Sequence, residues 1–527
     1  MRLAAGLAAL ALLLLALAWP FITRLGIEVD EAMIGNGLYE RASAWYSWDI
    51  LGNEIPVMLL TYLGALKTWL YNPIFALASP SAISLRLPMM LVAAAAPALV
   101  FFLVDRTADR PAAWLAAAML ATDPSFVLCS SIDLGFITFQ NTFKLAALLL
   151  LISFHRTGRP LQLAAACFLL GLAMWDKAVF SWVLAAFVIA GLAIFHREIR
   201  ARTTPRNLIV AALGFISGAL PLIVYNIARP LETFRSTAKF SLEGAVVKLY
   251  LLKRTLDGSA LFGFLTAADI GPDPGAPRSL LQHFAFWISS ILSSPTTTLT
   301  AAAFAIAVCA IPFLWRTPAR RPVLFFLTVM FITWLQMFLT TGAGGAAHHV
   351  ILLWPFHLIV IAIAASELIQ RRAILVAAAV ILCGSNLLVM NQYLVALIRN
   401  GGSVRWTDAF TPLARDLAQT KAGRIVTGDW GILETLNLMS EGALPVEDAS
   451  VLLRPGNPFP NAAAMLRERF AAPRTVWVLH SDTREEWTGV NAALAQAAAT
   501  AGYSKEVLQT VHDRNGRAIF DIVRFRR

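Results

Sequence analysis

Apolar segments of about twenty residues recur along this chain and constrain its fold more than any other feature. The first covers residues 3–22, which are nearly free of polar side chains. A helix needs about 20 apolar residues to cross the hydrocarbon core of a membrane. Hydrophobic residues make up 58% of the 527 residues and charged residues 14%, whereas a soluble protein is nearer half apolar and about a quarter charged. The chain is therefore predicted to be a polytopic membrane protein.

The positions of the basic residues predict how these segments cross the membrane. Short basic clusters stand between the apolar segments, and cytoplasmic loops of membrane proteins carry such an excess of Lys and Arg. If every cluster is cytoplasmic, the chain has about 11 spans. The clusters also account for the formal net charge of +11, so that this charge does not indicate nucleic-acid binding. They lie at residues 105–110, 155–159, 197–206, 316–321 and 371–372.

The start of the chain has two interpretations. Arg2 and the small residues near position 20 would also suit a cleaved signal peptide. A retained first helix agrees better with the later spans, because the next basic cluster must then be cytoplasmic. With Arg2 inside, the first helix delivers Asp30 and Glu31 to the outer face.

The fold class that follows is mainly α, a polytopic helical bundle with a small extracytoplasmic α/β domain. Residues 1–397 are expected to form the membrane domain, and residues 24–83 to form one or two helices along the outer interface. Residues 398–527 are expected to form the α/β domain, since charge density rises there and segments resembling strands alternate with helical ones. Residues 515–516, Asn-Gly, are a strong signal for a two-residue hairpin turn between the last strands.

Three carboxylates at the outer ends of apolar segments are candidate catalytic residues. Asp30 and Glu31 follow the first segment, either as a solvated acidic loop or as catalytic groups for a substrate whose other end lies in lipid. Asp133 heads a later span. It is either a helix N-cap or a site carboxylate that faces Asp30 across a cavity.

Several basic residues are candidates for binding a phosphate at the same face. Asp176 and Lys177 separate two short apolar segments, and charged groups at such a break either line a cavity or pair in a surface turn. His348 and His349 follow a glycine-rich loop. Two adjacent histidines diverge and do not suffice for a metal, so they are either phosphate or sugar contacts or ordinary loop residues. The remaining candidates are Lys67 and Arg229.

These groups suit transfer of a sugar from a polyprenyl phosphate whose tail lies in the bilayer. A carboxylate is needed to take the proton of the acceptor hydroxyl. Positive charge is needed to stabilise the departing phosphate. A divalent cation held by carboxylates is an alternative source of that charge, and no other cofactor is implied. The acceptor is left open among protein, lipid and glycan.

Five short motifs occur in an order that resembles one family. The motifs are residues 29–32 (Val-Asp-Glu-Ala), 63–71 (Leu-Gly-Ala-Leu-Lys-Thr-Trp-Leu-Tyr), 132–135 (Ile-Asp-Leu-Gly), 175–178 (Trp-Asp-Lys-Ala) and 348–350 (His-His-Val). With them the chain is similar, over residues 1 to about 397, to the bacterial relatives of the dolichyl-phosphate-mannose protein mannosyltransferases, of which the aminoarabinose transferases of lipid A are cousins.

The resemblance implies a glycosyltransferase of the C-type fold in a bacterial inner membrane. It implies lipid-linked sugar donors and inverting transfer on the extracytoplasmic side, with Asp30 as the general base and Glu31 and Asp133 supporting the site. Two features depart from the pattern. Ser130 and Ser131 stand where an Arg often precedes the later Asp. A Glu-Lys-Pro motif of the aminoarabinose branch is absent, so that the metal and phosphate assignments of that branch do not carry over.

Two other functions remain open from the sequence. A transporter or flippase of a lipid-linked sugar would have ionisable groups near the middle of the bilayer and broken helices in matching halves, whereas only residues 175–178 suggest such a break. A scaffold that displays the α/β domain would leave the outer carboxylates without a purpose. The glycosyltransferase is the favoured hypothesis.

Overall fold

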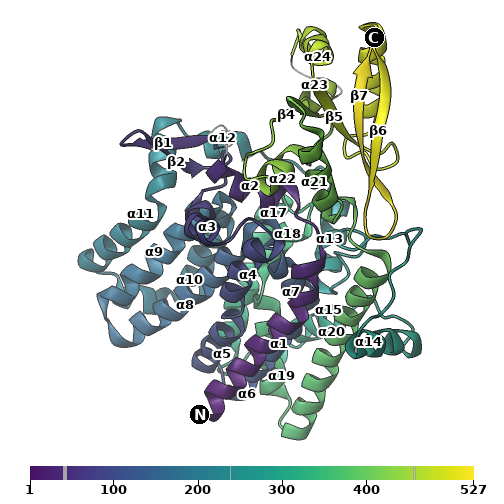
Figure 1. The fold of residues 1–527 in the computed structure, drawn as a ribbon. Helices are drawn as coiled ribbons and strands as arrows, with labels where there is room; N and C mark the ends of the chain where they lie inside the picture. Colours follow the sequence, from purple (N-terminus) through teal and green to yellow (C-terminus); the bar gives the residue numbers. More distant parts are fainter. Residues whose placement is uncertain (40–43, 238, 455, 457–458) are drawn as a thin grey trace.

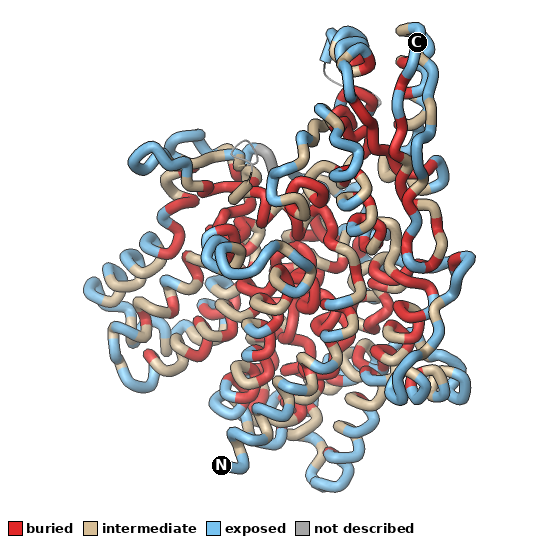
Figure 2. The backbone as a smooth tube through the Cα atoms, in the orientation of Figure 1, coloured by how far each residue is buried: buried red, intermediate tan, exposed pale blue. Residues whose placement is uncertain are grey.

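The computed structural model describes residues 1–39, 44–237, 239–454, 456 and 459–527. The chain forms a bundle of helices with a small sheet-containing region at one end, and the N-terminus lies at the opposite end (Figure 1). Buried segments run through the centre of the bundle and continue into the sheet (Figure 2). The predicted class, a mainly helical membrane protein with a small α/β region, is confirmed.

In the described residues, seven helices are long and apolar enough to cross a membrane, or up to nine if each of two bent pairs is one span. The predicted count of about 11 therefore stays a prediction. The spans are α1 (Arg2–Arg24), α4 (Ala82–Ala93) with α5 (Ala96–Thr107), α8 (Ile137–Thr157), α10 (Ser181–Arg202), α11 (Pro205–Ala228), α17 (Arg320–Phe338) and α20 (Arg372–Asn400). The bent pairs are α6 (Arg110–Thr122) with α7 (Pro124–Ser131), and α18 (Ala347–Val350) with α19 (Phe356–Leu368).

One segment that the sequence suggests as a single span, residues 284–315, is broken. It forms α14 (Leu280–Ile291), α15 (Thr300–Cys309) and α16 (Ile311–Leu314). Ser293 and Ser294 adopt positive φ values of 52° and 54°, which no α-helix accommodates. Pro295 follows them and lacks the N–H that a continuing helix would need.

The basic clusters meet at one end of the bundle. Arg156 donates to the carbonyl of Arg106 at 2.7 Å, and Arg202 donates to the carbonyl of His155 at 2.7 Å. Arg321 pairs with Glu198 at 2.6 Å. These contacts bring together the basic clusters at residues 105–110, 155–159, 197–206 and 316–321. This is expected if all four clusters lie on the same side of the membrane.

The segment between the first two membrane-spanning helices contains two helices and a hairpin. The helices are α2 (Val29–Tyr39) and α3 (Leu66–Leu77), and the hairpin pairs β1 (Tyr46–Ile50) with β2 (Asn53–Met58). The expectation of helices alone missed this hairpin. Leu51 and Gly52 form its two-residue turn with φ values of 55° and 79°, a conformation whose twist matches that of the paired strands.

The C-terminal region is built on a five-stranded sheet of order β4-β3-β5-β7-β6. β3 pairs in parallel with β4 and β5, and β7 pairs antiparallel with β5 and β6. The strands are β3 (Arg424–Thr427), β4 (Val446–Asp448), β5 (Thr475–His480), β6 (Ser504–His512) and β7 (Ala518–Arg526). The helices are α21 (Phe410–Thr420), α22 (Ile432–Met439), α23 (Ser450–Leu453), α24 (Ala462–Ala471) and α25 (Val490–Thr500).

The hairpin predicted at residues 515–516 exists, but its loop is longer than two residues. The N–H of Asp513 donates to the carbonyl of Arg517 at 3.0 Å, and this bond closes the loop. Asn515 is buried, and its side chain donates to the carbonyls of Asp273 and Arg399 at 3.2 and 3.1 Å. These tertiary contacts explain why the two-residue turn does not form.

The C-terminal region packs directly on α2. Asn36 of α2 donates to the carbonyl of Glu434 at 2.9 Å, and Asn437 donates to Asn36 at 3.2 Å. The segment before α21 contacts the loop between α1 and α2, since the N–H of Gly26 donates to the carbonyl of Trp406 at 2.9 Å. The helix that carries Asp30 therefore lies between the bundle and the sheet region. The division into domains at residue 397 stays a prediction, and it falls within the last turn of α20.

Candidate active site

Asp30 lies in the first turn of α2, just beyond the end of α1. Its N–H donates to Oε2 of Glu28 at 2.8 Å, which closes the loop between the two helices. Acidic residues in a first turn are stabilised by the positive end of the helix dipole. The side chain of Asp30 is only partly buried, and its carboxylate accepts no hydrogen bond from the residues that the structure describes. It is thus able to accept a bond from a substrate.

The carboxylate of Glu31 forms an ion pair with a buried arginine, Arg86. Both oxygens of this carboxylate bind Arg86 of α4, from Nε and Nη2, at 2.6 Å each. Nη1 of Arg86 also donates to the carbonyls of Ile22 and Leu25, at 3.0 and 2.9 Å, where α1 ends. Glu31 therefore anchors α2 to α1 and α4. Sequence analysis missed Arg86, although an arginine inside an apolar span is costly and signals a buried partner.

Both carboxylate oxygens of Asp133 have partners. Its Oδ1 accepts the N–H of Thr138 in the first turn of α8 at 2.9 Å, as a helix cap does. Its Oδ2 forms a buried ion pair with Lys67. The ammonium of Lys67 also lies 5.2 Å from the ring centroid of Phe136. Lys67 thus neutralises Asp133, and less of its charge is available to a ligand.

Asp176 and Lys177 stand at a true break, between α9 (Pro160–Asp176) and the short helix η3 (Ala178–Phe180) that leads into α10. The break is held by the segment between β2 and α3, since the N–H of Gly64 donates to the carbonyl of Asp176 at 3.1 Å. Lys177 Nζ donates to the carbonyl of Gly135 at 2.9 Å. An ammonium has three N–H donors, and this is its one acceptor among the described residues. The carboxylate oxygen Oδ2 of buried Asp176 has no partner there.

The two histidines reach the same place from α18. A Cβ on Gly135 would lie 2.5 Å from Cβ of His348, so that this histidine packs against the residue that binds Lys177. Nδ1 of His349 is buried and has no hydrogen-bond partner within the described parts of the chain. Arg229 lies elsewhere. It is exposed at the end of α11 and lines a separate surface pocket with Pro230, Glu232 and Arg235.

Burial and nearby charges shape the acidity of the carboxylates on α2. Burial raises the pKa of Asp30 above its ordinary value, while the positive charges of Lys177 and Arg405 oppose that rise. Burial, with the negative charge of Asp30 added, raises the pKa of Glu28 well above its usual range. Asp30 is thus within electrostatic reach of one cation from the bundle and one from the C-terminal region.

Arg405 is a second residue near the site, after Arg86, that the sequence interpretation did not find. It lies in η5 (Val404–Trp406), beyond the segment that the motifs cover. Its side chain is partly exposed and resembles any surface arginine in the sequence. Only the contact between η5 and the start of α2 brings it to Asp30.

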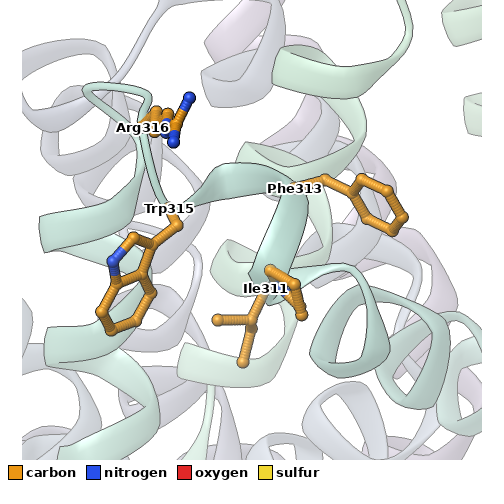
Figure 3. Close-up of a pocket in the computed structure, with 5 residues that line it drawn as sticks. Ile311, Phe313, Trp315 and Arg316 are labelled. Carbon is orange, nitrogen blue, oxygen red and sulfur yellow. The ribbon is translucent and has the colours of Figure 1, made fainter.

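A metal ion has no evident ligand set here. Among the described residues, no group of three His, Cys, Asp or Glu side chains could hold one. A pocket of about 470 Å³ beside α16 is unrelated to these residues (Figure 3). Trp315 and Arg316 line it, and Arg316 belongs to a cluster predicted to be cytoplasmic.

One family model matches part of the chain. The model of the dolichyl-phosphate-mannose-protein mannosyltransferase family matches residues 64–225, less than half of the chain. This region includes Lys67, Asp133 and Lys177. A search of curated proteins finds no match.

Two solved structures share the fold. ArnT from Cupriavidus metallidurans bound to undecaprenyl phosphate matches with a TM-score of 0.61 at 11% identity, covering 99% of this chain and 98% of that one. The oligosaccharyltransferase of Archaeoglobus fulgidus, in the apo form, matches with a TM-score of 0.50 at 14% identity, covering 97% and 74%. The match to ArnT extends over the C-terminal region, to which no family was assigned from the sequence.

At these identities the likeness establishes the fold, and the family model supports a transferase. The resemblance indicated by the five motifs is thereby confirmed: this chain is a polytopic membrane protein with the C-type glycosyltransferase fold of ArnT and the oligosaccharyltransferase.

Proposed function

We propose that this protein transfers a sugar from a polyprenyl-phosphate donor to an acceptor hydroxyl at the extracytoplasmic face of a bacterial inner membrane. Asp30 is the general base, and the reaction is a single displacement with inversion. A bound undecaprenyl phosphate in the structure of ArnT, which shares the fold, supports a donor of this class.

The proposal rests on one observation: the three candidate carboxylates differ in their ion-pair partners and in their exposure. Glu31 and Asp133 each pair with a buried cation, Arg86 and Lys67. Asp30 alone of the three is partly exposed and without such a partner. A general base must be within hydrogen-bond reach of the proton that it abstracts, and only Asp30 offers a free carboxylate for this.

The reaction needs one proton acceptor and one cation near the leaving group. Ionised Asp30 takes the proton of the acceptor hydroxyl, whose oxygen attacks the anomeric carbon of the donor sugar. The bond from that carbon to the phosphate oxygen breaks, and the phosphate leaves with the electron pair. Lys177 has N–H donors left to stabilise the charge on the leaving oxygen. His349 follows the histidine that packs on Gly135, and its Nδ1 has no partner among the described residues.

The side of the membrane on which the site lies is inferred from the two ends of the bundle. The basic clusters gather at one end, which the positive-inside rule assigns to the cytoplasm. The site and the sheet region lie at the other end (Figure 1). The sugar and the acceptor would therefore meet outside the cell membrane.

The test replaces Asp30 in a strain that lacks its own copy of the protein. Asp30→Asn should abolish the glycan change that the wild-type protein restores, as read by mass spectrometry of cell-envelope glycans. Asp30→Glu should retain part of it, because a carboxylate remains. Asp49→Asn, an exposed carboxylate in the β1–β2 hairpin, is the matched control. Full restoration by a folded Asp30→Asn protein would refute the role of Asp30.

A transporter or flippase of a lipid-linked sugar is the second candidate. The two bent helix pairs, at 53° and 40°, favour it, because such proteins build their sites from broken helices. Movement of a fluorescent polyprenyl-phosphate sugar across liposomes, with no covalent product, would support this function and contradict the first.

A further inference from the structure

The pocket of about 470 Å³ beside α16 lies far from Asp30, at the end of the bundle that carries the basic clusters. It is lined by Ile311, Pro312, Phe313, Trp315 and Arg316. The candidate span α17 begins a few residues later, at Arg320. The pocket therefore lies where the chain enters a membrane-spanning helix, and we name it the α16 pocket. The steps assigned above to Asp30 and Lys177 do not use it.

The apolar side chains of the α16 pocket are exposed on a fixed turn. Phe313 is 75% exposed and Trp315 is 51% exposed. Leu314, between them, is 1% exposed in the core, and its carbonyl accepts the N–H of Thr317 at 3.0 Å. Aromatic side chains are enriched at the level of the lipid headgroups. The turn thus presents preformed apolar surface at the height of the membrane interface.

Two guanidinium groups beside this surface have no anionic partner. No hydrogen bond or ion pair engages the side chain of Arg316 or Arg320 among the described residues. Arg320 stacks on Trp315, 3.7 Å from its ring centroid, and a stacked guanidinium keeps the N–H donors at its edge. The third arginine of the cluster, Arg321, is neutralised by Glu198 at 2.6 Å. Two positive charges therefore remain, and no carboxylate is among the described residues that line the pocket.

Charge and apolar surface together indicate a ligand that has both a phosphate and a hydrocarbon part. Guanidinium groups bind phosphate through two parallel hydrogen bonds. Figure 3 shows Arg316 at one end of the group of lining residues and Ile311 and Trp315 at the other. A soluble phosphate compound would use the arginines and leave Phe313 and Trp315 in water. An anionic phospholipid would use both parts, and pockets of about 300–1,000 Å³ suit ligands of this size.

We propose that the α16 pocket binds an anionic phospholipid of the cytoplasmic leaflet. Arg316 and Arg320 hold its phosphate, and Phe313 and Trp315 contact the adjoining glycerol and upper acyl chains. Basic pockets between membrane-spanning helices on the cytoplasmic side bind anionic headgroups in this way. The inference goes beyond the proposed function, because it involves neither the donor, nor the acceptor, nor Asp30.

The test measures lipid binding by native mass spectrometry of the full-length protein released from detergent micelles. Phosphatidylglycerol and phosphatidylcholine are titrated separately, and phosphatidylglycerol should bind more tightly to the first site. Arg316→Gln should weaken the first phosphatidylglycerol about fivefold, equivalent to ~1 kcal/mol. Phe313→Ser should also weaken it, because the lipid loses apolar contact. Both side chains are exposed, so that the variants should fold, as size-exclusion chromatography checks.

Arg371→Gln is the matched control. Arg371 is an exposed arginine of another basic cluster, and the nearby Ser366 bonds to Asp109 at 2.8 Å, which places that cluster at the same end of the bundle. Arg371 does not line the pocket, so its substitution removes the same charge and should leave the affinity unchanged. Undecaprenyl phosphate should bind Arg316→Gln as it binds the wild-type protein, because the proposed donor site lies at the opposite end.

Four outcomes would overturn the inference. Equal affinity for phosphatidylcholine would show that the phosphate charge is not recognised. Equal weakening by Arg371→Gln and Arg316→Gln would show diffuse attraction in place of a site. Displacement of phosphatidylglycerol by glycerol 1-phosphate would indicate a site for a soluble phosphate, and loss of undecaprenyl phosphate binding in Arg316→Gln would assign the pocket to the carrier lipid. Failure of the proposed function would appear separately, as transfer retained by Asp30→Asn.

Discussion

Removing Arg86 should destabilise the protein more than removing any surface arginine. Arg86 is 1% exposed and Glu31 is 8% exposed at the side chain, and the two form a two-point ion pair. Arg86→Ala would leave the carboxylate of Glu31 buried without its partner. It would also remove the hydrogen bonds to the carbonyls of Ile22, Leu25 and Gly26 at the end of α1. Breaking a buried pair on one side costs about 3–5 kcal/mol.

The assay is unfolding in mixed dodecylmaltoside and SDS micelles, followed by circular dichroism. Glu31→Gln should cost less than Arg86→Ala, because an amide can still accept one bond from Arg86. The double variant should be more stable than the sum of the two single losses, since the uncompensated charge is then gone. Arg514→Ala removes an exposed pair with Asp408, and it should cost at most about 1 kcal/mol. A loss for Arg86→Ala as small as that of this control, or strict additivity in the cycle, would refute the assignment of Arg86 as the anchor.

Two further predictions concern charge at the site. Burial raises the pKa of Asp30, and only its ionised form acts as a base, so kcat/KM should rise with pH at values above the ordinary pKa range of aspartate. Lys177→Ala removes a positive charge that opposes this rise in pKa, and it should shift the rise in kcat/KM to still higher pH. A shift to lower pH would contradict this prediction. Lys67→Met leaves Asp133 unpaired in a buried place and should lower the amount of folded protein recovered, as measured by size-exclusion chromatography, while Lys67→Arg keeps most of it.

Local signals account for what could be predicted. The apolar segments and basic clusters specify a polytopic bundle, because the cost of moving a side chain into lipid depends on that residue and its immediate neighbours. The break at Asp176 and Lys177 could be predicted for the same reason. The β1–β2 hairpin could have been found from Gly52 and the alternation of Tyr46, Trp48 and Ile50, but the aromatic residues were interpreted as interfacial helices.

Pairings between distant segments could not be predicted. The sequence shows that Glu31 and Asp133 lie at the ends of apolar segments, yet it does not show that Arg86 and Lys67 neutralise them. Arg405 lies beyond the residues that the motifs cover. Its segment is held near the start of α2, where the N–H of Gly26 donates to the carbonyl of Trp406. Such contacts depend on how helices and loops pack after they form, and packing energy is summed over many distant neighbours.

The sequence alone thus determined that the chain crosses the membrane repeatedly, which end carries the charged groups, and which short motifs belong together. Hydropathy and charge act residue by residue, so these properties can be seen before any fold is known. The tertiary structure decided which carboxylate is left free. Glu31 and Asp133 pair with Arg86 and Lys67, and Asp30 has no such partner among the described residues. The tertiary structure also brought the C-terminal region to Asp30, which no local pattern encodes.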